Sequence, residues 1–185
     1  EFQDNSLGDV LDGVTLDLVE TGDTTFEVTR DKEGTKEQLQ GFVDSYNEVI
    51  DLINKSVAVT ENSNRGRTLA GDSTIQHLKN SLRDLVSGNL DNMTGDFSAL
   101  SHIGITSNGL GRLTLSSDDL SDALEADMDS VGRLFSQDTD GLADLLIDKV
   151  DAYTDSLDGI LMDKKDSLND QVRNIDKRIF RLEDR

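Results

Sequence analysis

The stretch from residue 168 to residue 182 reads LNDQVRNIDKRIFRL and decides the fold class. Its large apolar residues recur in alternating steps of four and three. That spacing is the a/d heptad pattern of a helix that buries one narrow stripe against another helix. We call these five residues the seam: Leu168, Val172, Ile175, Ile179 and Leu182. The pattern predicts a coiled-coil helix whose role is assembly rather than chemistry.

The helical pattern continues to Arg185 without a residue that usually stops a helix. Glycine, asparagine or proline commonly follows a helix C-terminus, and none of them follows Leu182. Glu1-Phe2 is also an unusual beginning for a protein. We therefore expect the sequence to be a piece of a longer protein in which the helical bundle continues.

A second apolar stripe predicts a long helix that begins near Thr35. Its members share one face at the helical period and are Leu39, Phe42, Val43, Tyr46, Val49, Ile50 and Ile53. We expect this face to pack against other helices, as the seam does.

Shorter amphipathic segments predict the other helices. Asp72 caps a helix that Gly88 ends, and Gly141 precedes a helix that runs to Tyr153. Two short helices are expected over 117–126 and from 128 to 135, and Gly159 separates the terminal helix from the one before it.

Two segments have the alternating pattern of β-strands. Residues 103–115 predict a small hairpin around an Asn-Gly turn. Near the N-terminus, Val14–Leu18 and Thr25–Thr29 predict a second hairpin, which needs a further surface because two strands alone are marginal. The expected fold is mainly α: an elongated antiparallel helical bundle over 34–185, with a β-hairpin junction or domain remnant over 1–33.

Composition excludes several classes of function. The 185 residues carry a formal net charge of −20, which disfavours nucleic acid and anionic membrane surfaces as partners. Residues 164–185 are the exception, with seven basic and five acidic residues, a net charge of +2 that leaves −22 for the rest. No apolar run is long enough to predict membrane insertion. Only 4% of the residues are aromatic, which suits elongated helices that bury narrow stripes.

The sequence predicts neither an enzyme nor a cofactor site. The absence of cysteine excludes a thiol nucleophile, a thiolate metal site and a disulfide. His77 and His102 lie in separate segments without metal-ligand spacing. Residues 136–141 resemble part of a calcium loop, but Ile147 occupies the position that needs a bidentate glutamate. Gly109-Leu110-Gly111 lacks the third glycine of a dinucleotide loop.

Several short motifs resemble, in their order and spacing, the C-terminal half of a bacterial protein family. They are Gly13–Leu16, Phe42–Asn47, Leu69–Thr74, Ile103–Thr106, Gly111–Leu115 and Gly159–Leu161. The family is the flagellar filament cap protein, hook-associated protein 2. In it, residues 34–185 would be a helical leg and residues 1–33 the junction to a β-rich head.

The resemblance implies a secreted structural protein of the bacterial flagellum. Such a protein is exported by the flagellar machinery with a chaperone and forms a ring-like homo-oligomer at the filament tip. There it promotes polymerisation of flagellin and prevents its leakage. Two alternatives stay open from the residues: another axial protein, such as flagellin or a hook–filament junction protein, and an adhesion module that binds a host surface. A glycan hydrolase is the least favoured alternative, because the chain has no tryptophan to line a sugar cleft.

Overall fold

The computed structural model describes most of the chain in two units. The described residues are 6–11, 14–17, 19–23, 25, 27, 29–59, 68–91, 93–137 and 140–184. Unit 1 is Glu1–Arg30 and unit 2 is Asp31–Arg185.

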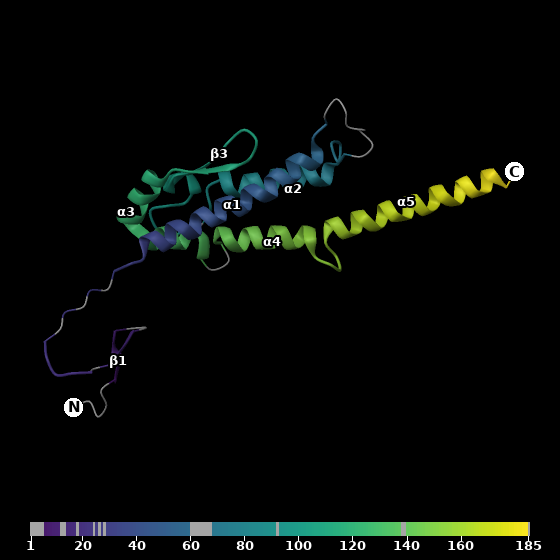
Figure 1. Cartoon of the computed structure of the whole chain (residues 1–185). Coiled ribbons are helices and arrows are strands. Elements are labelled where there is room, and N and C mark those ends of the chain that lie inside the picture. Colours follow the sequence, from purple (N-terminus) through teal and green to yellow (C-terminus); the bar gives the residue numbers. More distant parts are fainter. Residues whose placement is uncertain are drawn as a thin grey trace. The chain divides into compact units, whose positions relative to one another are not determined.

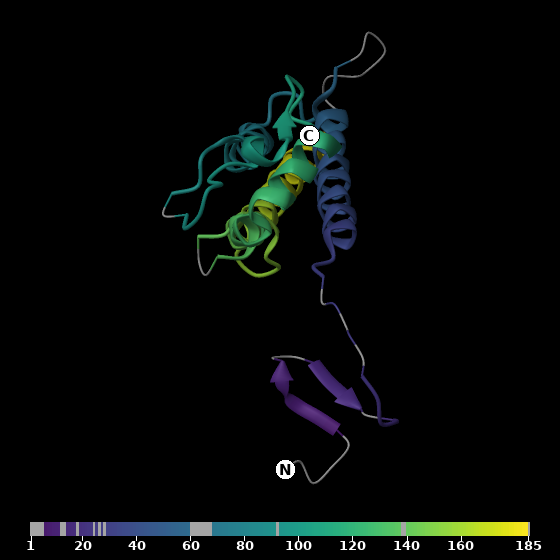
Figure 2. The ribbon, with the colours of Figure 1, turned by 90° about the vertical axis from the view of Figure 1, so that its left-hand side faces the viewer.

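Unit 1 contains a two-stranded antiparallel hairpin of β1 (Ser6–Leu11) and β2 (Val14–Asp17), shown in Figure 2. The predicted pairing of Val14–Leu18 with Thr25–Thr29 is wrong, because β2 pairs with the preceding segment. The described members of the expected second strand, at 25, 27 and 29, belong to no strand, while Phe26 and Val28 lie outside the described residues. Only Asp12-Gly13 separates β1 from β2 in the sequence, a dipeptide that favours tight hairpins.

Unit 2 is mainly helical, as predicted (Figure 1). Its α-helices are α1 (Lys32–Val57), α2 (Ser73–Ser87), α3 (Ser117–Ser136), α4 (Leu142–Thr154) and α5 (Ile160–Glu183). A short 3-10 helix, η2 (Leu100–Ile103), precedes the hairpin of β3 (Ile105–Ser107) and β4 (Leu113–Leu115). Among the described residues, no helix is both long enough and apolar enough to cross a membrane.

Local sequence signals set the helix ends. The Asp72 carboxylate caps α2 by accepting a hydrogen bond from the backbone N–H of Thr74 at 2.9 Å, and Gly88 follows the last turn. Asp31 caps α1 in the same way, accepting from the N–H of Gly34 at 2.8 Å. Both helices therefore begin close to the predicted positions, and α2 also ends where Gly88 predicted.

The two short helices predicted around residue 127 form one element, α3, with a kink at Asp127 (φ −157°, ψ 87°). The Asp127 carboxylate accepts hydrogen bonds from the N–H of Ser130 at 3.0 Å and from its hydroxyl at 2.5 Å, so it caps the second half of α3. The Ser130 hydroxyl bond is the main cause that lowers the pKa of Asp127. Arg133 links this cap to the preceding loop by donating to the carbonyl of Thr94 at 2.7 Å.

The β3–β4 hairpin is joined to α1 by one buried polar side chain. The Asn47 amide nitrogen donates to the Leu113 carbonyl at 3.0 Å, and the amide oxygen accepts from the Leu113 N–H at 2.7 Å. Sequence patterns did not single out Asn47, because its partner lies 66 residues away.

The core of unit 2 lies between one face of α1 and the other elements of the bundle. Five of the predicted α1 residues are buried, and Phe42 is partly buried against them. Opposite them lie Leu82, Val86, Ile103, Ile105, Leu113, Leu120, Leu124, Val131, Leu134 and Leu142. The prediction for Val49 is wrong: its side chain lies at the edge of the apolar face and is 46% exposed.

Candidate assembly surface

The seam predicted on the terminal helix lies on α5 and is exposed along its whole length. None of the described residues of α5 is buried. The exposed fractions are 46% for Leu168, 56% for Val172, 53% for Ile175, 47% for Ile179 and 69% for Leu182. The contact with another helix that the heptad pattern predicts is therefore not made within the described residues, and the assembly role of the seam stays a prediction.

The turn between α4 and α5 sets the direction of α5. The Asp155 carboxylate accepts hydrogen bonds from the N–H groups of Leu157 at 2.7 Å and Asp158 at 3.2 Å, and these bonds lower the pKa of Asp155. Gly159 closes the turn so tightly that an added Cβ would lie 2.4 Å from the carbonyl oxygen of Asp155. After this turn α5 runs in roughly the same direction as α4 (Figures 1 and 2).

An ion pair ties the first turn of α5 to the bundle. The Lys164 ammonium lies 3.1 Å from the Asp72 carboxylate, which also caps α2. The hydrogen bond from Lys164 is the main cause that lowers the pKa of Asp72, and the backbone N–H groups of Ile75 and Thr74 add to it. The start of α5 is therefore positioned by the bundle, while the rest of the helix projects its seam away from it.

The two predicted stripes thus have different surroundings. The α1 stripe, apart from Val49, contributes to the core of this chain, and its Phe42 makes an edge-to-face contact with Phe135 at a ring-centroid distance of 5.5 Å. The α5 stripe has no comparable cover among the described residues. The sequence pattern alone does not distinguish the two, because both repeat at nearly the same period.

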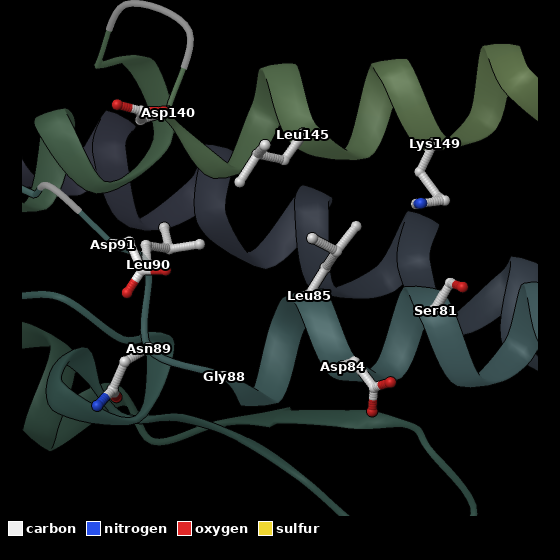
Figure 3. A pocket seen from close by; sticks show the side chains of 10 residues that line it. All are labelled: Ser81, Asp84, Leu85, Gly88, Asn89, Leu90, Asp91, Asp140, Leu145 and Lys149. Carbon is white, nitrogen blue, oxygen red and sulfur yellow. The ribbon is translucent and has the colours of Figure 1, made fainter.

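The structure also contains a hollow of about 530 Å³, lined by both polar and apolar side chains, between the end of α2, the following segment and α4 (Figure 3). Its charged side chains are Asp84, Asp91, Asp140 and Lys149. Throughout the part of the chain that the structure describes, no group of three His, Asp or Glu side chains is placed to hold a metal ion. His77 and His102 are both exposed and lie on different elements, as their sequence positions indicate.

These elements and their order match a known family. The family model described as the flagellar hook-associated protein 2 C-terminus matches residues 1–185. The chain belongs to this family. The resemblance found in the sequence motifs is thereby confirmed.

Curated relatives and a solved structure agree with this assignment. The chain is 36% identical over 160 residues to the B-type flagellar hook-associated protein 2 of Pseudomonas aeruginosa, covering 81% of this chain and 33% of the relative. It is 30% identical over 133 residues to the flagellar hook-associated protein 2 of Salmonella typhimurium, covering 68% and 28%. The chain therefore spans about a third of the length of the curated relatives it matches.

The fold is similar to the crystal structure of the flagellar cap protein FliD, domains D1-D2-D3, from Escherichia coli. The TM-score is 0.75 at 27% sequence identity, and the match covers 88% of this chain and 44% of that chain. The helical architecture predicted from the sequence is confirmed by this likeness.

Proposed function

We propose that this chain is the leg region of a flagellar cap protein, a secreted structural subunit at the tip of the growing filament. The full-length protein would form a ring-like homo-oligomer that promotes flagellin polymerisation and prevents flagellin leakage. One observation carries the proposal: a chain that belongs to the hook-associated protein 2 family over its whole length leaves a heptad seam uncovered on α5. A chain built for assembly needs such a surface, whereas a catalyst needs a reactive pocket.

The proposed mechanism is geometric. The bundle supplies a rigid body, and the tight turn at Gly159 with the Lys164–Asp72 ion pair fixes where α5 leaves it. With 24 residues, α5 extends about 36 Å along its axis. The leg would hold a head domain at a set distance from the filament while flagellin subunits insert. Partners would be other copies of the chain, flagellin, and the flagellar export machinery with its chaperone.

The comparisons favour the cap over the alternatives. The relatives named above are hook-associated proteins 2 rather than flagellins or adhesins. The solved neighbour is a flagellar cap protein, which supports a structural role without catalysis.

The proposal is tested by charging the seam in the full-length protein. Ile175→Asp with Ile179→Asp places two carboxylates where apolar contact is expected, and burying unpaired charges is costly. In a motile strain that lacks its own cap protein, this variant should leave cells non-motile and release flagellin monomer into the medium. Both side chains are about half exposed and lie outside the shared core, so the thermal melting of the core helices α1 to α4 should stay unchanged.

A matched control separates the seam from the added charge. Lys177→Asp changes the net charge by the same amount, lies between the two seam positions in sequence, and is exposed outside the seam. This control should swim and retain its flagellin. Normal swimming of the seam variant, at equal protein level, would refute the proposed role of the seam.

A further inference from the structure

The sequence has a single Asn-Gly step, Asn108-Gly109, and it lies in the loop of the β3–β4 hairpin (Figure 1). The Asn108 N–H donates to the Arg112 carbonyl at 2.8 Å, and the Gly111 N–H donates to the Asn108 carbonyl at 2.9 Å, so these bonds close the loop. Asn108, Gly109 and Leu110 are all exposed. The hairpin therefore presents an Asn-Gly peptide to water on a defined backbone frame.

The Asn108 side chain folds back over this loop. Its amide oxygen accepts hydrogen bonds from the backbone N–H of Leu110 at 3.0 Å and from that of Arg112 at 3.1 Å. These bonds hold the side-chain carbonyl against the backbone of the loop, where the Gly109 nitrogen follows directly. Both N–H groups also point at the oxygen that gains negative charge when a nucleophile adds to this carbonyl, as the donors of an oxyanion hole do.

The Gly109 nitrogen is the nucleophile next to that carbonyl. Among the described residues its N–H donates no hydrogen bond, so no bond has to be broken when it loses its proton. A Cβ added at Gly109 would meet nothing within 4 Å, and the φ of Gly109 lies outside the left-handed region. Because glycine has no side chain, the approach to its nitrogen is unobstructed.

The two Asp-Gly steps among the described residues lack this freedom. They are Asp140-Gly141 and Asp158-Gly159, and both glycines are buried. The Gly141 N–H donates to the Gln137 carbonyl at 2.8 Å, and the Gly159 N–H donates to the Asp155 carbonyl at 3.1 Å. The nitrogen that would attack the preceding side chain is thus engaged at both steps, in contrast to the nitrogen that follows Asn108.

We propose that Asn108 is a site of spontaneous modification, where the chain converts its own amide into aspartate and isoaspartate. The Gly109 nitrogen gives its proton to solvent and attacks the side-chain carbonyl carbon of Asn108. The bond from this carbon to Nδ2 then breaks, and the nitrogen leaves as ammonia with a proton taken from solvent. The product is a cyclic succinimide.

Water opens the succinimide in two ways. Cleavage between the ring nitrogen and the former side-chain carbonyl restores the ordinary backbone and leaves aspartate. Cleavage between the ring nitrogen and the backbone carbonyl gives isoaspartate, whose main chain runs through Cβ and the former side-chain carbonyl. Either route consumes one water and releases one ammonia, without an oxidant or a reductant.

The two products have different consequences for the hairpin. Aspartate adds one negative charge to the formal −20 and keeps an oxygen that can accept from Leu110 and Arg112. Isoaspartate adds a carbon to the main chain between Asn108 and Gly109. The start of β4 cannot move to accommodate it, because Leu113 is held to α1 by both hydrogen bonds of Asn47. Isoaspartate therefore strains the hairpin, whereas aspartate leaves it in place.

The first experiment incubates the 185-residue chain and follows it by peptide mapping and ammonia release. Both products should accumulate at Asn108, faster at higher pH because the Gly109 nitrogen must lose its proton. Gly109→Ala fits the open space and should slow conversion about tenfold, a barrier difference of about 1.4 kcal/mol.

An internal reference lies on α2. Asn80 is exposed and precedes Ser81, whose N–H is engaged by the helix. Asn80 should stay unmodified while Asn108 converts. Equal rates in Gly109→Ala and the original chain, or conversion at Asn80 before Asn108, would overturn the proposal.

The second experiment repeats the incubation in guanidinium chloride. Asn108 should convert at rates within about tenfold in the folded and unfolded chains, because its loop is already open to attack. Asp158 should isomerise only in the unfolded chain, where the Gly159 N–H is released from Asp155. Stronger protection of Asn108 in the folded chain, or equal isomerisation of Asp158 in both, would overturn the proposal.

The third experiment compares the products in thermal melts. The isoaspartate form, separated by ion exchange, should melt at a lower temperature than Asn108→Asp, which represents the aspartate product. Melting of the two at the same temperature would overturn the inferred strain on the hairpin.

Discussion

Asn47→Ala tests how the bundle holds its β-hairpin. The Asn47 amide forms hydrogen bonds of 3.0 and 2.7 Å with the carbonyl and the N–H of Leu113. Both residues are buried, with exposed fractions of 7% for Asn47 and 2% for Leu113. The Asn47 side chain therefore pairs with both backbone groups of Leu113, as a neighbouring strand would, and so joins β4 to α1.

The expected cost follows from the two backbone groups that lose their partner. A buried polar group left without a hydrogen bond costs about 1–3 kcal/mol, so the two groups of Leu113 together predict a loss of about 2–6 kcal/mol in the free energy of unfolding. Asn47→Asp should also be destabilising, because the amide donor becomes a carboxylate oxygen beside a carbonyl oxygen.

The assay is urea unfolding of the 185-residue chain, followed by far-ultraviolet circular dichroism. Asn54→Ala is the matched control on the same helix: its amide donates one exposed hydrogen bond of 3.3 Å to the carbonyl of Leu110. The control should lose about 0.5 kcal/mol or less. If Asn47→Ala costs no more than the control, the reasoning about buried backbone groups is wrong.

Three further outcomes are expected. Tyr46→Phe should not lower stability near neutral pH, because the Tyr46 hydroxyl has no hydrogen-bond partner among the described residues. Burial raises the pKa of Tyr46 to about 12, so the stability that its neutral side chain contributes is complete below pH 10 and is lost as pH rises to 12. Urea titrations should show this alkaline loss in the chain with Tyr46 and not in Tyr46→Phe. Asp72→Asn should reduce the loss of stability in acid. Because the pKa of Asp72 is lowered in the folded chain, its carboxylate stabilises the fold above the unfolded pKa of about 3.9, and this contribution is lost as pH falls through the folded pKa. Gly159→Ala should destabilise the junction of α4 and α5, because its Cβ would meet backbone at 2.4 Å, while Gly41→Ala in open space on α1 should stabilise by about 0.5–1 kcal/mol in thermal melts.

Features with a local signal were predictable from the sequence. The caps at Asp72 and Gly88 were predicted because side-chain caps and glycine stops act within a few residues. The kink at Asp127 was predicted as the boundary between two short helices, one over 117–126 and one from 128 to 135.

Features that depend on distant partners were not predictable in this way. Asn47 is a polar residue on an apolar face, and only the hairpin 66 residues later gives it a role. The N-terminal strand pairing was wrong because β2 pairs with β1, and an alternating pattern alone does not specify which neighbouring segment a strand pairs with. Val49 fits the helical period, but its side chain lies at the edge of the apolar face and is 46% exposed, so its period did not predict its burial.

The seam on α5 has an energetic consequence for how the leg is held together. The bundle is stabilised by its shared core, whereas α5 buries no described side chain. Helices gain most of their stability from packing an apolar face, and an isolated helix of this length is marginal in water. Pairs within α5, such as Arg173 with Asp170, add only a few tenths of a kcal/mol each. Covering the seam therefore both assembles the leg and stabilises its last helix, so docking and the folding of α5 are thermodynamically coupled.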